Sequence, residues 1–219
     1  MKLLSRLFSA FGLAVLAAAG FAATAWLIGM ERISWFDSAI IPVVQGWERP
    51  GLTSLMEGLT WFGRTVPTTV FSFLIMAFLF FVLRHRWELL LFVVVMIGST
   101  LLNKIMKELF GRERPDIHRL AEEAGYSFPS GHAMASFALY GILTYLLWRH
   151  ITSGAGRTVL VAVCALMFLG IGTSRIYLGV HYPSDVLGGY LASGAWLGLS
   201  IGAYERWSRK RRAAGRRAS

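Results

Sequence analysis

The chain has 219 residues and a formal net charge of +10; 55% of its residues are hydrophobic and only 16% are charged. A soluble domain carries about 25% charged residues, so this composition excludes an ordinary soluble domain, and its hydrophobicity excludes a disordered chain. The lone cysteine, Cys164, excludes an internal disulfide framework, and the clustering of the apolar residues into blocks indicates an integral membrane protein.

Six uncharged, mostly apolar blocks are candidates for crossing a bilayer, which takes roughly 20 residues. In chain order they are Leu7–Met30, Thr65–Leu83, Leu89–Asn103, Ala133–Trp148, Thr158–Ser174 and Val186–Tyr204. The third and fourth are short and must borrow flanking residues, since Lys104 can snorkel and 130–132 can begin a helix. The first could be mistaken for a signal peptide, but its length and the lack of a polar domain behind it favour a retained helix. We therefore predict an all-α integral membrane fold with six transmembrane helices in one domain, residues 1–219.

The distribution of basic residues predicts the orientation of these helices. With both termini in the cytoplasm, the inside segments sum to a charge of +11 and the outside segments to −1. A Lys/Arg bias of this size in short loops sets topology. We expect an N-in, C-in multi-pass protein of the cell (plasma or inner) membrane. Its basic tail, residues 205–219, lies in the cytoplasm and is attracted to anionic lipids; without an accompanying fold it does not indicate nucleic-acid binding.

Two further features concern packing. The long outside segment between the first two helices, Glu31–Arg64, contains Trp35, Trp47 and Trp61 among a few charges, which predicts one or two amphipathic helices along the interface. The last block carries glycines at four-residue spacing on one helix face, where a neighbouring helix can approach closely inside the bundle or between subunits. These glycines are Gly194, Gly198 and Gly202.

Three clusters of polar residues are not explained by topology, and all fall at outside helix ends between residues 104 and 189. Lys107, Arg114 and Arg175 form a cationic set that suits phosphate oxygens. Pro129-Ser130-Gly131 predicts a turn into a helix, with Ser130 as its N-cap. A helix start offers free N–H groups to an anion, and Gly131 lets the backbone approach it closely.

Two histidines complete the set. His181 and Asp185 are four residues apart at the start of the sixth helix, so the carboxylate can hold one ring nitrogen and leave the other free. His132 follows Gly131 directly. One histidine could attack phosphorus while the other protonates the leaving oxygen, and the residues alone do not choose between them.

The order and spacing of these motifs resemble those of a known family. The segments are Lys107-x6-Arg114-Pro115, Pro129-Ser130-Gly131-His132 and Ser174-Arg175-x5-His181-x3-Asp185. Together they are similar to the three signature motifs of the type 2 phosphatidic acid phosphatase superfamily, with no departure at a motif position. The motifs span about the second half of the chain, and the six-helix plan extends the resemblance to nearly all of it.

The resemblance implies a metal-independent integral membrane lipid phosphatase without cofactors, with its site at the extracytoplasmic face. It implies that His181 is the nucleophile that becomes a phosphohistidine, that Asp185 orients it, and that His132 is the general acid. The resemblance also implies a phosphate-binding set: Lys107, Arg114, Ser130, Gly131 and Arg175. Its substrates would be lipids of the bilayer, namely undecaprenyl pyrophosphate, phosphatidylglycerol phosphate or phosphatidic acid.

Two other readings compete with the lipid phosphatase. Vanadium haloperoxidases share these motifs, but they are soluble and larger, which the six apolar blocks contradict. A non-catalytic lipid-anion transporter or scaffold belongs to a different functional class from an enzyme. Transporters often show paired broken helices in related halves, and a degenerate family member has usually lost a catalytic residue; we find neither sign. The loop 116–128, with Glu122, Glu123 and Tyr126, is the candidate determinant of headgroup preference, although its acids could equally be solvated.

Overall fold

The computed structural model describes residues 2–84, 86–116 and 118–218, and these form eight α-helices and connecting loops. The helices are α1 (Lys2–Gly29), α2 (Ser34–Gln45), α3 (Pro50–Phe62), α4 (Thr65–Phe81), α5 (Arg86–Phe110), α6 (Gly131–Trp148), α7 (Gly154–Tyr177) and α8 (Pro183–Ala218). The predicted all-α fold is confirmed for this part of the chain.

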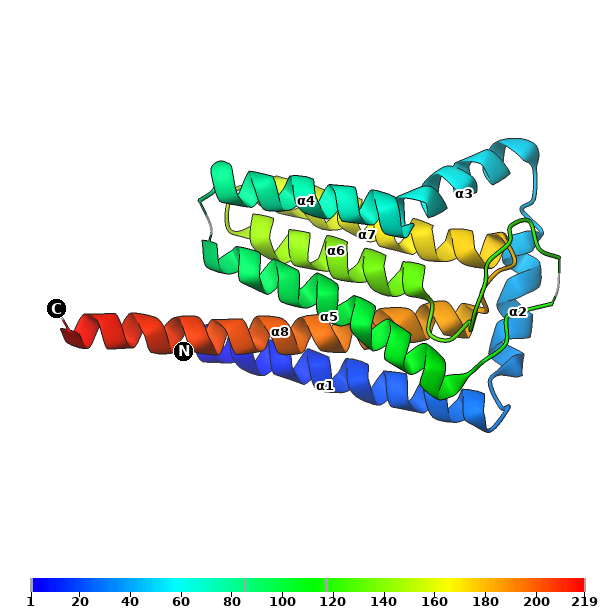
Figure 1. Ribbon diagram of the computed structural model, residues 1–219, viewed down its shortest axis with the longest axis horizontal. Coiled ribbons are helices and arrows are strands. Elements are labelled where there is room, and N and C mark those ends of the chain that lie inside the picture. Colours follow the sequence, from blue (N-terminus) through cyan, green and yellow to red (C-terminus); the bar gives the residue numbers. More distant parts are fainter. Residues whose placement is uncertain (1, 85, 117, 219) are drawn as a thin grey trace.

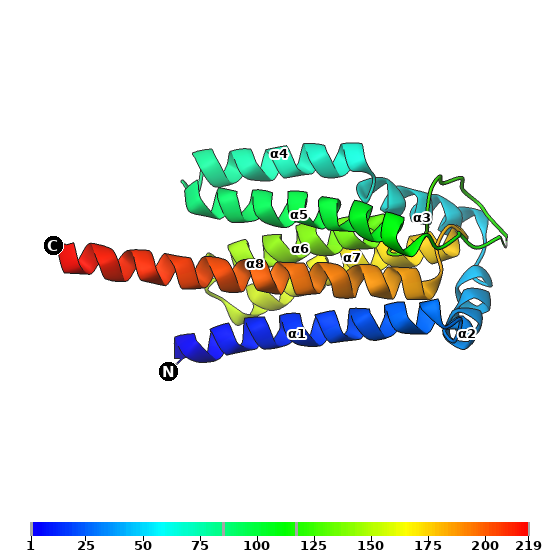
Figure 2. The same ribbon diagram turned by 60° about the horizontal axis from the view of Figure 1, so that its bottom comes forward.

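The long helices run side by side along the long axis, and α2 crosses one end of them (Figure 1; Figure 2). The start of α1 and the end of α8 lie at the opposite end in both views. Outward-facing positions carry large apolar side chains, such as Phe73 at 64% and Leu166 at 70% exposure, as expected of a surface that contacts lipid. The bundle therefore has one end capped by short helices and loops and one end that holds both termini.

Four helices are long and apolar enough by themselves to cross a membrane: α1, α5, α7 and α8. A fifth crossing is possible if α3 and α4, which meet at a 55° bend, act together. Six crossings were expected, and the one outside this set is α6, an 18-residue helix that begins with the polar pair Gly131-His132. The described residues thus contain four or five spans by length and composition, as expected of a multi-pass membrane protein.

Two helices extend well beyond the apolar blocks that predicted them. The third block ends at Asn103, but α5 continues to Phe110 and carries Lys107 in its last turn. The last block ends at Tyr204, but α8 continues through the basic tail to Ala218. Charged residues mark where a helix leaves the apolar layer, but its backbone hydrogen bonding can continue beyond that point. The length of an uncharged run therefore underestimates the length of both helices.

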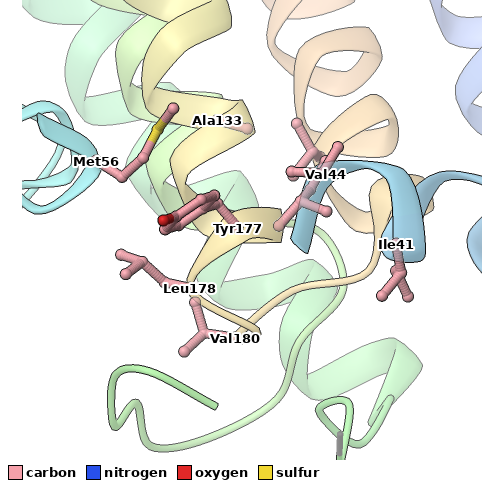
Figure 3. Packing of buried hydrophobic residues seen from close by; sticks show 9 residues of the cluster. Ile41, Val44, Met56, Ala133, Tyr177, Leu178 and Val180 are labelled. Carbon is pink, nitrogen blue, oxygen red and sulfur yellow. The ribbon is translucent and has the colours of Figure 1, made fainter. Parts of the chain in front are cut away.

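The segment 31–64 forms two helices, as predicted. A cluster of buried apolar side chains fastens α2 and α3 to the ends of α7 and α8: Ile41 and Val44 come from α2, Met56 from α3, and Tyr177 from α7 (Figure 3). The Tyr177 hydroxyl is 2.7 Å from Thr53 Oγ1 of α3. This packing fixes α2 and α3 over the end of the bundle where the three motifs lie.

The glycine stripe of α8 packs against α1, inside the bundle. A Cβ on Gly198 would lie 2.9 Å from the Ala14 Cβ, and one on Gly202 would lie 2.8 Å from the Phe11 ring. Such distances are shorter than side chains tolerate, so α1 and α8 approach each other closely only because these positions lack a side chain. The predicted packing role is confirmed for Gly198 and Gly202, and it is intramolecular; a Cβ on Gly194 would make only ordinary contacts, the nearest at 3.5 Å.

Candidate active site

The His181 imidazole is buried in the short turn between α7 and α8. Gly179, with φ +72°, allows the chain to reverse directly after α7, and Pro183 begins α8 two residues after the histidine. His181 is 2% exposed, and its Nδ1 lies 3.4 Å from Oδ2 of Asp185, which is fully buried. The same Oδ2 accepts a hydrogen bond from the backbone N–H of Tyr182 at 2.9 Å. The four-residue spacing therefore does bring the carboxylate to one nitrogen of the ring, as the sequence predicted.

The other ring nitrogen faces a cation. Nε2 of His181 is 3.2 Å from Nη1 of Arg114. Backbone carbonyls hold this guanidinium in place: it donates to Val180 O and Gly125 O at 2.9 Å each, and to Ala124 O at 3.1 Å. An imidazole that donates from Nδ1 to a carboxylate keeps its lone pair on Nε2, the atom that points toward Arg114.

The surroundings keep this imidazole uncharged. Burial, and then the positive charges of Arg114, Arg175 and Lys107, hold the pKa of His181 well below its ordinary value of 6.5. A neutral imidazole retains the Nε2 lone pair that a nucleophile needs, and the same cations attract a phosphate to it.

Arg175 is paired with a carboxylate of the loop. Its side chain is only 4% exposed; Nη2 lies 2.6 Å from Glu123 Oε2, and Nη1 donates to Thr60 Oγ1 of α3 at 2.6 Å. Its Nε is buried without a hydrogen-bond partner among the described residues. Glu123 also interacts electrostatically with Lys107 and Arg114. A carboxylate thus lies among the three cations expected to hold phosphate.

The second motif forms the start of α6. Ser130 is the N-cap, as predicted: its hydroxyl faces Ala133 N at 3.5 Å, and its own N–H donates to Asp185 O at 3.0 Å. His132, one residue into the helix, has a buried Nε2 with no hydrogen-bond partner in the described part of the chain. It interacts electrostatically with His181, Arg175 and Lys107. The eight predicted site residues therefore gather at one end of the bundle.

Four residues at this end were not predicted to contribute. Arg112 bridges Asp185 and Asp37, Thr60 contacts Arg175, and the Asn103 amide donates to Pro129 O at 2.9 Å. Arg112 lies within the first motif as a charge of unassigned role, which was the available signal. Asp37 and Thr60 come from the interfacial segment, where charges and hydroxyls are ordinarily exposed to solvent.

A cavity of about 470 Å³ lies between α4, α5 and α6 and reaches Gly131 at the start of α6. Its surface is mainly apolar, with several hydroxyl side chains and one amide among the lining residues. The polar wall residues include Thr65, Thr68, Thr69, Ser72, Ser99 and Asn103, and apolar residues such as Phe73, Met76 and Ile97 line the rest. The cavity connects the motif-bearing end with the flank of the bundle.

Comparisons with known proteins agree with this architecture. A family model described as the PAP2 superfamily matches residues 88–209. Phosphatidylglycerophosphatase B of Bacillus subtilis is 36% identical over 155 residues, 70% of this chain and 76% of that protein. Decaprenylphosphoryl-5-phosphoribose phosphatase of Mycobacterium tuberculosis is 33% identical over 192 residues, 83% of this chain and 99% of that protein.

A solved structure shares the fold as well. The crystal structure of a transmembrane PAP2 type phosphatidylglycerolphosphate phosphatase from Bacillus subtilis aligns with a TM-score of 0.81 at 31% identity, covering 89% of this chain and 96% of that one. Fold and relatives together define a multi-pass membrane protein of the lipid phosphatase class. The chain belongs to the PAP2 superfamily, which confirms the resemblance drawn from its motifs.

Proposed function

We propose that this protein hydrolyses phosphate monoesters or pyrophosphates of membrane lipids through a phosphohistidine on His181. The observation that carries the proposal is the setting of this one ring: Nδ1 faces the buried Asp185 and Nε2 faces the fixed guanidinium of Arg114. A neutral, oriented imidazole among three cations suits attack on a phosphoryl group, whose transition state is stabilised mainly by positioning and by positive charge.

In the proposed first step, the Nε2 lone pair of His181 bonds to phosphorus while the bond from phosphorus to the leaving oxygen breaks. His132, protonated once the phosphate anion is bound beside it, gives that oxygen its proton, so the lipid alcohol or lipid phosphate leaves in protonated form. Water, deprotonated by His132, then attacks the phosphohistidine and regenerates the free His181 imidazole and inorganic phosphate. Within the described residues the buried Nε2 of His132 has no hydrogen-bond partner, which supports this role because the atom is available to the leaving oxygen.

Phosphate binding is assigned to Lys107, Arg114 and Arg175, with the Ser130 hydroxyl and the Gly131 N–H at the start of α6. No resident metal or cofactor takes part in these steps. For Arg175 to bind phosphate, its ion pair with Glu123 must open, which places the loop 116–128 at the point where headgroups are selected.

The substrates we propose are undecaprenyl pyrophosphate, phosphatidylglycerol phosphate and phosphatidic acid. The names of the two relatives, which specify a glycerophospholipid and a polyprenyl phosphate, support this range. The cavity between α4, α5 and α6 would hold the part of the lipid chain next to the headgroup.

The proposal includes a topology. All residues 1–219 form one membrane-embedded domain with six spans, α6 being the short one; the motif-bearing part is 104–189, and the tail 205–219 is cytoplasmic. The site then faces the extracytoplasmic side of the cell membrane, opposite both termini, in keeping with the arrangement in Figure 1. In a Cys164→Ala background, an impermeant maleimide should label Glu57→Cys in intact cells and Ala213→Cys only after lysis; the reverse would refute the orientation.

The direct test is phosphate release by the purified protein in detergent micelles with EDTA, on each of the three lipids. Release should survive EDTA, vanish in His181→Ala, and be only reduced in Ser130→Ala, because the backbone donor remains. Acid-labile radioactive phosphate should be trapped on the wild-type chain and not on His181→Ala. Loss of release with EDTA would contradict the metal-free mechanism, and equal mild losses in both variants would contradict the nucleophile. No release from any lipid by folded protein would favour a transporter or scaffold.

A further inference from the structure

Behind the His181–Asp185 pair lies an arginine that contacts two carboxylates. Nη1 of Arg112 donates to Asp185 Oδ1 at 2.6 Å, and Nη2 donates to Asp37 Oδ2 at 3.0 Å. The guanidinium also lies over the Tyr182 ring, 4.2 Å from its centroid, and Nη1 donates to Ser184 Oγ at 2.8 Å. Arg112 is therefore held from both sides in this geometry.

Asp37 comes from a different part of the chain, the first turn of α2. It is only 3% exposed, although α2 packs across the end of the bundle where charged residues could reach water. Its Oδ1 accepts the Ser184 N–H at 2.8 Å and its Oδ2 accepts the Ser184 hydroxyl at 2.7 Å. Pro183 has no N–H, so Asp37 caps the first free donor of α8 from outside that helix. Among the described residues, the Asp37 carboxylate accepts hydrogen bonds only from Arg112 and Ser184.

The charges of this group explain why a second carboxylate is needed. Arg112 alone would neutralise Asp185, which would then oppose little of the positive charge that develops on the His181 ring when Nε2 bonds to phosphorus. With Asp37 included, Asp37, Arg112 and Asp185 carry a formal charge of −1. This matters because the ring otherwise faces mainly cations. The other charged or titratable groups around it are Lys107, Arg114, Arg175 and His132, with Glu123 paired to Arg175.

We propose that Asp37 is a positioning residue of the active site that acts through Arg112: it holds the guanidinium so that Asp185 keeps its geometry and its effective negative charge toward His181. The inference rests on the proposed phosphatase function and deepens it. It also assigns a catalytic role to α2, because this helix contributes the Asp37 carboxylate, which lies outside the three motifs.

The test compares Asp37→Asn with Glu57→Gln. Asparagine keeps the size of Asp37 but removes its charge and replaces one acceptor oxygen with an NH2 group, so it retains only part of the hydrogen bonding to Arg112 and Ser184. Glu57 is an exposed carboxylate of α3 that lies outside the site. For Asp37→Asn, kcat should fall ~10- to 100-fold, as is typical when a group behind a functional histidine is lost, with KM changed by no more than about twofold. Glu57→Gln should match the wild type in both constants.

The pH profile separates an electrostatic role from a merely structural one. Removing a negative charge disfavours the imidazolium, so the acid limb of kcat should move to lower pH in Asp37→Asn. Ser184→Ala removes hydroxyl contacts of both Asp37 and Arg112 but keeps all three charges, so its acid limb should stay in place. A structural role predicts equal losses in these two variants and no movement of the limb, and that result would overturn the proposal.

A double-mutant cycle tests the route through Arg112. In an Arg112→Gln background, Asp37→Asn should lower kcat by less than about twofold, because the two residues act as one unit. If Asp37→Asn lowers kcat as much in that background as in the wild type, the proposal is overturned. Wild-type kcat in the single variant Asp37→Asn would also overturn it. If Asp37→Asn does not fold, Arg112→Lys tests the same route through kcat alone: its single ammonium cannot bridge two carboxylates, and unchanged kcat would overturn the proposal. A folded wild-type protein inactive on every lipid would instead refute the proposed function.

Discussion

The ion pair between Glu123 and Arg175 leads to a quantitative prediction about affinity. Its carboxylate occupies a place among the cations where a phosphate would bind, so the two anions compete for Arg175. Replacement of Glu123 by glutamine removes the charge and nearly preserves the shape. The competing bond weakens, and affinity for phosphate should rise.

The size of the effect follows from the geometry. The contact is 2.6 Å and Arg175 is 4% exposed, but Glu123 is 28% exposed and partly screened by solvent. A hydrogen bond between charged groups contributes about 1.5–3 kcal/mol and a neutral one about 0.5–1.5 kcal/mol. The difference, about 1 kcal/mol after screening, corresponds to roughly a fivefold change in a binding constant.

Orthovanadate and inorganic phosphate are suitable probes, because neither contains a lipid chain whose binding could obscure the effect. Their inhibition constants should fall about fivefold in Glu123→Gln by the same arithmetic. Glu122→Gln is the matched control, since it removes the same charge from the adjacent, exposed position and should shift the constants far less. Unchanged or weaker inhibition in Glu123→Gln, or equal shifts in both variants, would refute competition at Arg175.

Two further predictions concern the histidines. A Cβ on Gly63, at the bend between α3 and α4, would lie 2.8 Å from the His132 ring and 2.8 Å from Ile171 Cγ2, so Gly63→Ala should cost about 1–3 kcal/mol in packing and lower kcat. Gly58→Ala, in the same helical segment with no atom within 4 Å, should leave kcat intact, and similar losses in both would contradict the contact. Because burial and nearby cations lower the pKa of His181, its imidazole should gain a proton only when the pH falls well below 6.5. Carbon-13 histidine spectra of the free enzyme, assigned with His181→Ala, check this, and a midpoint near 6.5 would contradict it.

The sequence was sufficient for those parts of the site that are local in the chain. His181 and Asp185 are four residues apart across the start of α8, so their contact is local in the chain, and Ser130 before an apolar run predicts a cap. The three motifs fall at helix ends on the same side of the predicted membrane, which indicated that these ends lie together. These inferences need no knowledge of how distant segments pack.

The parts that escaped prediction depend on contacts between distant segments. Asp37 and Arg112 lie 75 residues apart, and no spacing rule pairs an interfacial carboxylate with an arginine inside a motif. Thr60 and Arg175 are 115 residues apart, brought together by the packing of α3 against α7. The interfacial segment was expected to lie along the membrane surface, and its amphipathic pattern does not reveal that one of its few acids is buried.

The cavity between α4, α5 and α6 bears on how a membrane lipid would reach the proposed site. A lipid that enters between α4 and α5 need never leave the bilayer, so its encounter with the site is a search in two dimensions. The relevant concentration is then the mole fraction of substrate among the other lipids, and bulk concentration has little meaning. Diluting the substrate with inert detergent or phospholipid at constant total amount should slow turnover, and affinities are properly expressed in mole per cent of the surface.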